Sequence, residues 1–237
     1  MLEAAMWGFV GGLALVIGAL IAFALRPKKH AVAYVMAFGA GVLISAVAYD
    51  LTADAFELGG GDAVAIGLAA GALVYAGLSL LTRPRGGGDR TEAGARALAL
   101  GALLDGIPES AAIGLTLVEG GEVSGAFLAA VFISNLPEGI SSSQKFELAG
   151  RGTAPILLIW LGIAAASALA AGLGYELLGG GSEDLQAATK AFAGGAILTM
   201  LATEMMPDAF EESGKSLLVG LITVLGFALA AYLTAIG

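Results

Sequence analysis

The sequence predicts an all-α integral membrane protein that forms one transmembrane domain over residues 1–237. Of the 237 residues, 58% are hydrophobic and only 13% are charged, and the mean hydropathy is +0.89. A soluble domain of this size does not need so much apolar surface, so these values indicate a chain that folds in lipid. The chain has no cysteine, which excludes disulfides and thiolate metal sites.

Eight apolar segments are each long enough to cross a bilayer, which takes about 20 residues as a helix. The links between them are too short to form a soluble domain, and several are rich in glycine. The first segment follows Met1-Leu2-Glu3, which lacks the basic residues of a signal peptide, so we expect that segment to be retained. The expected spans are residues 4–25, 31–53, 63–82, 97–118, 123–144, 154–178, 187–208 and 216–236.

The basic residues predict how the chain is oriented, because they concentrate in cytoplasmic loops. Ten of the eleven Lys and Arg residues flank the loops after the first, third, fifth and seventh spans, and only Lys190 falls on the other side. The loop after the third span carries Arg83, Arg85 and Arg90. We therefore expect both termini outside the cytoplasm, in a multi-pass protein suited to a prokaryotic plasma membrane.

The chain also contains an internal repeat. Residues 37–57 align without a gap with residues 191–211, and eight of the 21 positions are identical. The aligned acids are Asp50 with Glu204, and Asp54 with Asp208. The two segments run in opposite directions in the predicted topology, which is a mark of secondary transporters built from inverted repeats.

This repeat predicts a bundle of three, two and three helices. The first repeat covers about residues 1–82, the central helix pair about 97–144, and the second repeat about 154–237. Transporters of this design bind their substrate at the interface between the repeats.

The central pair carries two polar motifs inside apolar segments, DGIPES from Asp105 and SNLPEG from Ser134. An Asp in the hydrocarbon core costs roughly 2.5–3.5 kcal/mol on insertion scales, so acids at this depth are rarely incidental. Residues four apart share a face of a helix, which places Asp105 beside Glu109 and Ser134 beside Glu138. Both motifs therefore present polar groups on one face.

A proline stands before each motif glutamate, and it frees a backbone carbonyl one turn earlier in the helix. Three acids that face one another in a low dielectric must bind protons or a cation. Packing of kinked helices through protonated acids is the structural alternative. We favour a divalent metal site because it explains both motifs. The predicted ligands are Asp105, Glu109, Ser134, Asn135 and Glu138.

The two motifs resemble those of the ZIP family of divalent metal transporters, whose fourth and fifth helices carry HNxPEG-like and HExPEG-like sequences. The stretch EMMPD from Glu204 is similar to a further family motif, and the resemblance spans all eight helices. It implies transport of zinc or a similar divalent cation toward the cytoplasm. It also implies Glu109 and Glu138 as metal ligands, with Asn135 at another ligand position.

The chain departs from the family where histidines are expected, because Asp105 and Ser134 stand at those positions. Imidazole suits zinc, whereas carboxylate and carbonyl oxygens suit harder cations such as Mn²⁺. The sequence therefore predicts weaker selectivity for zinc, with Mn²⁺ and Fe²⁺ as equal candidates on chemical grounds.

The expected path has an entrance and an exit. We expect Asp50 and Asp54 to pass the cation to the central site, and Glu204 and Asp208 to assist its release. The cation is the substrate; we predict no prosthetic group, no enzyme active site and no nucleic-acid partner. The expected partners are the cation and the lipid bilayer, and the glycine-rich pattern allows a homodimer without predicting one.

Other functions are compatible with parts of the sequence. A metal sensor or degenerate family member would bind metal without transport, and the missing histidines favour it. A carrier of another solute would keep the repeat but needs basic groups in mid-membrane for an anionic substrate. An intramembrane aspartyl protease is suggested by Tyr49-Asp50, but its partner GxGD motif is absent.

Overall fold

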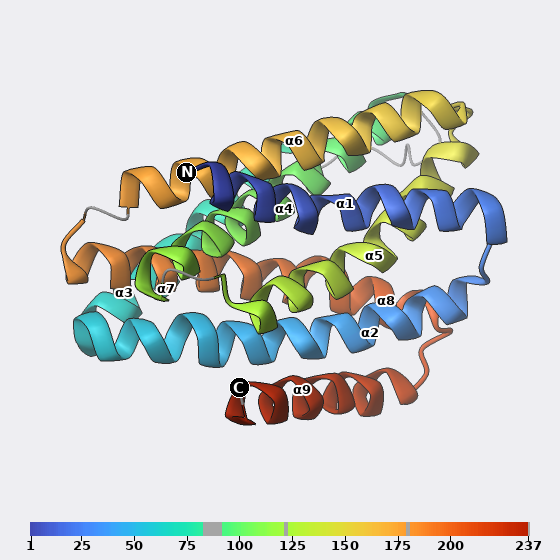
Figure 1. Cartoon of the computed structure of the whole chain (residues 1–237). Coiled ribbons are helices and arrows are strands. Elements are labelled where there is room, and N and C mark those ends of the chain that lie inside the picture. Colours follow the sequence, from blue (N-terminus) through green and yellow to red (C-terminus); the bar gives the residue numbers. More distant parts are fainter. Residues whose placement is uncertain (83–91, 121–122, 179–180, 237) are drawn as a thin grey trace.

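A computed structural model describes residues 1–82, 92–120, 123–178 and 181–236, and within these ranges the chain is helical and contains no strand (Figure 1). The basic link residues Arg83, Arg85 and Arg90 lie outside the described residues. The elements are α1 (Leu2–Leu25), α2 (Lys29–Ala46), η1 (Val47–Ala53), α3 (Asp54–Thr82), α4 (Glu92–Gly120), α5 (Gly125–Leu148), α6 (Thr153–Leu178), α7 (Glu183–Met200), η2 (Leu201–Met205), α8 (Met206–Glu212) and α9 (Leu218–Ile236).

Among the described residues, six helical runs are long and apolar enough to cross a membrane, judged by length and composition. The predicted all-α, multi-pass character is therefore confirmed. The runs are Leu2–Leu25, Lys29–Leu81, Ala99–Val118, Thr153–Glu176, Glu183–Glu212 and Leu218–Ala235. The run Lys29–Leu81 has 53 residues, more than twice what one crossing takes. The number of crossings stays a prediction.

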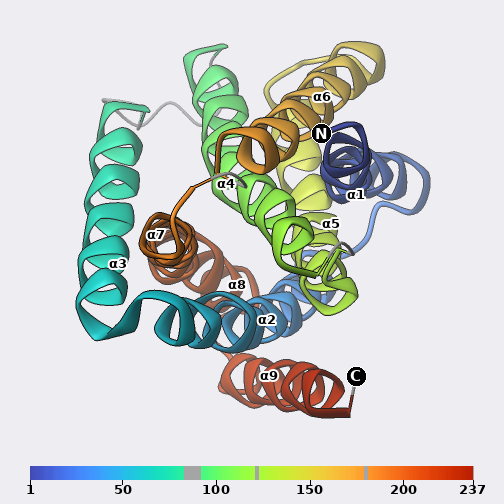
Figure 2. The same ribbon diagram turned by 60° about the vertical axis from the view of Figure 1, so that its left-hand side comes forward.

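Gly60 interrupts that long run with a φ of 70° and a ψ of −174°. A positive φ of this kind is readily adopted only by glycine. The break lies in the glycine-rich link at residues 59–61, and the chain turns sharply there between the first residues of α3 and the rest of that helix (Figure 2). α5 is not among the six runs, because polar residues such as Asn135 and Glu138 lower its mean hydropathy.

Two helix pairs are built alike: α3 packs along α7, and α9 packs along α2. In both pairs, a glycine on each helix lies against the backbone of the other, so a Cβ there would overlap a carbonyl oxygen. The overlaps are Gly71 with Phe192, Gly195 with Leu68, Gly41 with Thr223, and Gly226 with Phe38. Small residues of this kind let membrane helices approach closely. Gly41 and Gly195 are aligned in the internal repeat, as are Phe38 and Phe192.

The remaining contacts follow the same pattern. α1 packs on α5, α4 packs on α6, and α1 and α6 pack on each other. Glycines again allow close contact: Gly139 of α5 lies against Leu15 of α1, and Gly114 of α4 lies against Ala171 of α6. The largest buried apolar cluster joins α2, α5 and α7, and it includes Leu43, Phe127 and Ile197.

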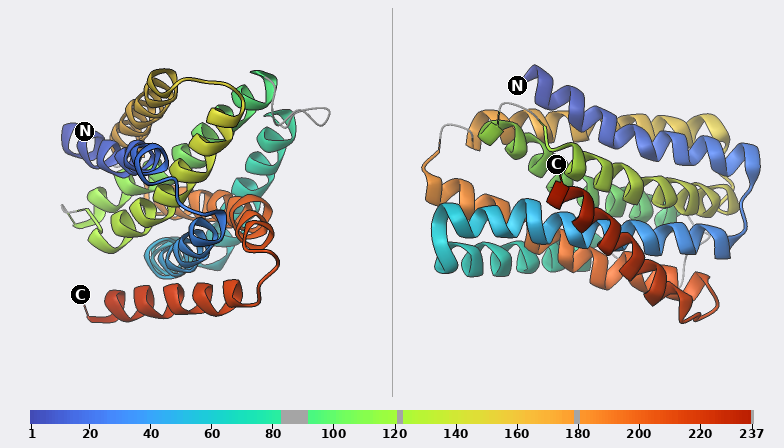
Figure 3. Two further views of the ribbon diagram at one scale, coloured as in Figure 1. Left: turned by 90° about the vertical axis from the view of Figure 1, so that its right-hand side faces the viewer. Right: turned by 60° about the horizontal axis from the view of Figure 1, so that its bottom comes forward.

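The helices differ in how far they are enclosed. α7 lies between α3 and α4 inside the bundle (Figure 2). α9 runs along the outside beside α2 (Figure 3), and only 17% of its apolar window is buried. Its exposed leucines, among them Leu221, Leu225 and Leu229, suit contact with lipid chains.

Candidate metal centre

Asp105 and Glu109 lie one turn apart on α4, and both side chains are buried, with 8% and 1% exposed. α4 remains helical through Pro108 between them. The Oε2 atom of Glu109 is buried without a hydrogen-bond partner. Because an unsatisfied buried polar atom costs free energy, it calls for an explanation.

The second motif lies on α5, which also continues through Pro137. Ser134 Oγ donates to the Val131 carbonyl oxygen at 2.9 Å, and Asn135 Nδ2 donates to the Gly11 carbonyl oxygen of α1 at 3.3 Å. These bonds use the one donor of the Ser134 hydroxyl and one of the two amide donors of Asn135, and the side-chain oxygens retain acceptor capacity. Glu138 is half-buried on the same helix.

Glu204 of η2 joins Asp105 through a tyrosine of α3. The Tyr75 hydroxyl contacts Asp105 Oδ1, and it also lies 2.9 Å from Glu204 Oε1. Ser79 Oγ, one turn further along α3, donates to the same Glu204 oxygen at 3.1 Å. A hydroxyl has one proton, so Tyr75 can donate to only one carboxylate at a time. Glu204 keeps the Ser79 donor in either case, so it is Asp105 that needs a proton or a cation when Tyr75 donates to Glu204.

Four acids therefore influence one another at this place. The carboxylates of Asp105, Glu109 and Glu204 all repel that of Glu138. They come from α4, α5 and η2, three elements distant in sequence. Repulsion among carboxylates in a low dielectric favours binding of protons or of a cation.

The two acids aligned in the internal repeat lie in the same unusual backbone. Asp50 is in η1 and Glu204 is in η2, and both segments are π-helical. The π-helices begin at Val47 and Leu201, which are aligned positions. Such segments are rare and often mark functional sites. Asp50 Oδ2 is buried without a hydrogen-bond partner.

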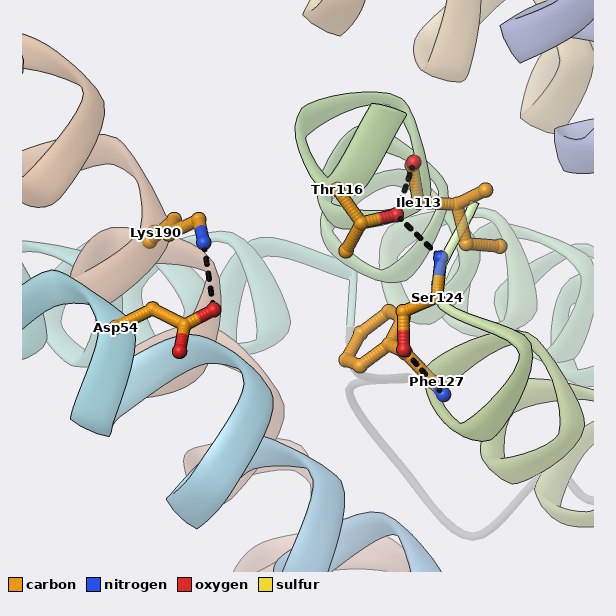
Figure 4. A network of polar contacts seen from close by, with 6 residues as sticks. All are labelled: Asp54, Ile113, Thr116, Ser124, Phe127 and Lys190. Atoms are coloured by element: carbon orange, nitrogen blue, oxygen red, sulfur yellow. Dashed lines mark hydrogen bonds and ion pairs between the residues drawn. The ribbon is translucent and has the colours of Figure 1, made fainter. Parts of the chain in front are cut away.

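Asp54 forms an ion pair with Lys190, whose Nζ lies 2.9 Å from Asp54 Oδ2 (Figure 4). The Lys190 side chain is 1% exposed, whereas that of Asp54 is 45% exposed. Lys190 lies near the start of the seventh expected span, and α7 holds its side chain inside the protein. A buried lysine is costly in a membrane protein unless it is paired.

A second ion pair involves the aligned aspartate. Lys145 of α5 lies 3.0 Å from Asp208 Oδ2 and 3.6 Å from Glu212 Oε1, both of α8. Ser141, one turn before Lys145, has its Oγ 3.2 Å from the same Glu212 oxygen. Ser134, Glu138, Ser141 and Lys145 follow the spacing of one helix face, so a polar stripe runs along α5 from the motif to this ion pair.

The connection between α4 and α5 is also held by polar contacts (Figure 4). Thr116 Oγ1 donates to the Ile113 carbonyl oxygen at 2.9 Å and accepts from the Ser124 backbone N–H at 3.2 Å. Ser124 Oγ accepts from the Phe127 N–H at 3.1 Å and caps α5. These bonds fix how the two motif helices are joined.

The structure thus brings some predicted residues together and separates others. Asp105, Glu109 and Glu204 lie close enough to Glu138 for their charges to repel its own, whereas Asp54 and Asp208 lie in separate ion pairs. Within the part of the chain that is described, no group of three or more His, Cys, Asp or Glu side chains is arranged to hold a metal ion.

Sequence reasoning missed Tyr75, Ser79 and Glu212. Tyr75 and Ser79 are four residues apart in an apolar segment, so they lie on one face, and this spacing was the available signal. Glu212 lies four residues after Asp208 and could have been found in the same way.

Neither a scan against protein-family models nor a search of curated proteins gave a match for this chain. The resemblance to the ZIP family therefore rests on the motifs alone.

Proposed function

We propose that this protein transports a divalent metal cation across the membrane, through a carboxylate-lined site between α4, α5 and η2. The observation that carries the proposal is Glu109, whose Oε2 atom is buried without a partner in a side chain only 1% exposed. A carboxylate oxygen in such surroundings is stabilised most directly by a cation.

The cluster around Tyr75 supports a cation as well. The Tyr75 hydroxyl has one proton for Asp105 and Glu204, and Glu204 also accepts from Ser79, so ionised Asp105 loses the Tyr75 donor whenever Tyr75 donates to Glu204. A divalent cation near Glu109 and Glu138 would neutralise the repulsion among all four acids. Protons would take its place after release, which links cation movement to proton movement in the opposite direction.

Transport, rather than binding alone, is supported by the paired architecture. α3 on α7 and α9 on α2 are equivalent contacts under the predicted inverted repeat, and so are α1 on α5 and α6 on α4. The π-helical segments begin at aligned positions. In transporters with inverted repeats, movement of one repeat against the other exposes a central site to each side in turn. Under the predicted orientation the cation moves toward the cytoplasm, in a bundle of eight crossings.

The donor set favours a hard or borderline cation. The proposed ligands are carboxylate, amide and hydroxyl oxygens, which suit Mn²⁺ and Mg²⁺ better than imidazole or thiolate sites do. Fe²⁺ and Zn²⁺ remain in the proposed substrate class, and we expect Zn²⁺ to have little advantage over Mn²⁺.

A second candidate is metal binding without flux. It is favoured by Asp105 and Ser134, which stand where the ZIP motifs have histidines. A site of this kind would close around the cation without opening to the other side.

Flux measurements in proteoliposomes separate the two candidates. We expect the parent protein to take up Mn²⁺ and Zn²⁺. Glu109→Gln and Glu138→Gln should each lose at least 90% of that uptake, because a tenfold loss corresponds to only ~1.4 kcal/mol of lost interaction with the cation. Glu211→Gln is the matched control, because Glu211 is 67% exposed and its Oε1 lies 3.7 Å from Lys215 Nζ at the surface. Binding without uptake would favour the second candidate, and unchanged uptake in both site variants would disprove the proposed site.

A further inference from the structure

Two lysines contact the aspartates that the internal repeat aligns. Lys190 lies 2.9 Å from Asp54, and Lys145 lies 3.0 Å from Asp208. The aspartates occupy equivalent positions, but the lysines do not, since Lys190 belongs to α7 and Lys145 to α5. Duplication of one ancestral pair therefore does not explain the second pair. Each of the two aligned aspartates is thus paired with a lysine, and the two lysines come from helices that are not equivalent in the repeat.

The two ion pairs lie toward opposite ends of the bundle. The start of α7 and the junction of η1 with α3 are near one end of Figure 1, whereas α8 and the end of α5 are near the other. Asp54 follows Asp50 by four residues, and Asp208 follows Glu204 by four. Each pair therefore lies one turn beyond an acid in a π-helical segment, between the central site and one end of the molecule.

The exposure of the partners is unequal. Asp54 and Asp208 have side chains 45% and 51% exposed, so a dissolved cation can reach both carboxylates. Lys190 is 1% exposed, so its ammonium group reaches Asp54 from inside the protein, whereas Lys145 is 36% exposed and is only somewhat more covered than its partner Asp208. Each aspartate can thus be shared between a fixed internal cation and a dissolved one.

We propose that Lys190 and Lys145 are tethered competitors that determine cation specificity: each ammonium occupies an aspartate on the transport path until a divalent cation displaces it. This inference rests on the proposed transport function. A monovalent cation gains no charge advantage over an ammonium group, whereas a divalent cation does. Competition also weakens binding at both ends, which speeds release.

The test compares the two partners of one ion pair. If the pair merely holds α3 against α7, Lys190→Met and Asp54→Asn break the same contact and change KM in the same direction. If Lys190 competes with the substrate, Lys190→Met lowers KM for Mn²⁺ uptake about fivefold, which corresponds to ~1 kcal/mol, and Asp54→Asn raises it. Lys190→Met should also make uptake sensitive to K⁺, and the parent protein should show much weaker inhibition.

Lys190→Arg provides a variant that keeps the charge if Lys190→Met does not fold. Its planar guanidinium can bind both carboxylate oxygens of Asp54, so it should compete better and raise KM. An unchanged KM in Lys190→Arg would contradict the inference. Arg26→Met is the control for loss of a surface ion pair, because Arg26 and Glu147 are 74% and 44% exposed, and it should change neither KM nor K⁺ inhibition.

The other end gives an independent comparison. With flux measured in the reverse direction, Lys145→Met should lower KM and Asp208→Asn should raise it. Equal shifts for both members of a pair would overturn the inference while leaving the proposed function intact, provided that Glu109→Gln still abolishes uptake. Absence of Mn²⁺ and Zn²⁺ uptake in the parent protein would overturn both.

Discussion

In the second aligned segment, Glu204 is held by Tyr75 at 2.9 Å and by Ser79 at 3.1 Å. In the first segment, its counterpart Asp50 keeps a buried oxygen without a hydrogen-bond partner. The same contrast recurs one turn earlier, where Thr199 donates to the Gly195 carbonyl oxygen at 2.8 Å and the aligned Ser45 has a buried Oγ without a partner.

The partner helices explain this difference. α3 packs against α7 and supplies the tyrosine and the serine. α9 packs against α2 in the equivalent way, but the residue that corresponds to Tyr75, counted from Gly226 as the equivalent of Gly71, is Ala230. Matched backbones therefore hold different polar environments. Glu204 is therefore held by hydrogen bonds from its partner helix, whereas the aligned Asp50 keeps one buried oxygen without a partner.

The largest expected effect comes from breaking the matched helix contacts. A Cβ at Gly71 or Gly226 would overlap a backbone carbonyl oxygen of the partner helix, whereas one at Gly77 or Gly220 would meet nothing within 4 Å. We expect Gly71→Ala and Gly226→Ala to lower the free energy of unfolding by ~1–3 kcal/mol. Gly77→Ala and Gly220→Ala, on the same two helices, should be neutral or stabilising by up to ~1 kcal/mol.

Thermal unfolding in detergent measures these four variants side by side. The effect of Gly71→Ala should exceed that of Gly226→Ala, because α7 is enclosed and α9 lies outside the bundle. Equal stability of Gly71→Ala and Gly77→Ala would contradict the close contact of α3 with α7.

The next prediction concerns the hydroxyl of Tyr75, a hydrogen-bond donor that has no counterpart at the equivalent position Ala230. Tyr75→Phe removes the hydroxyl that Asp105 and Glu204 share, and we expect it to reduce stability by ~1–3 kcal/mol. Added Mn²⁺ should restore part of the loss, because a cation neutralises the same two carboxylates. Tyr232→Phe is the control, as Tyr232 is 63% exposed. A Tyr75→Phe protein as stable as this control would show that the shared hydroxyl contributes little.

The smallest effect distinguishes the two aligned acids. Glu204→Gln should weaken Mn²⁺ binding about tenfold, or ~1.4 kcal/mol, because Glu204 belongs to the central group of acids. Asp50→Asn should change the affinity for Mn²⁺ less than threefold, which is about half of the ~1.4 kcal/mol that a tenfold change represents. The readout is the shift in unfolding temperature with Mn²⁺ concentration. Equal losses in the two variants would mean that both halves contribute alike.

The sequence predicted the all-helical character and several apolar runs long enough to cross a membrane, because such runs are local signals. The arrangement of eight crossings as three, two and three helices stays a prediction. The sequence also singled out Asp105, Glu109 and Glu138 as candidate ligands, since acids in apolar segments stand out by their cost, and their role in binding metal stays a prediction. It did not predict the π-helical segments at Asp50 and Glu204, whose backbone hydrogen bonding leaves no distinct residue pattern.

The sequence also did not predict side-chain contacts between residues that are far apart along the chain. Tyr75 meets Glu204 across 129 positions, and Lys190 meets Asp54 across 136. Lys190 lies near the start of an expected span, so the sequence indicated a position beside a loop and not a buried side chain. Its burial depends on how α3 covers α7, which a single sequence does not reveal.

The most direct test of the central claim locates the cation itself. Crystals or grids of the protein loaded with Mn²⁺, examined by anomalous scattering or difference density, should show a metal within about 2–2.6 Å of Glu109 Oε2. The same position should be empty in Glu109→Gln prepared identically. Metal density confined to Asp54 or Asp208, with none beside Glu109, would contradict the account.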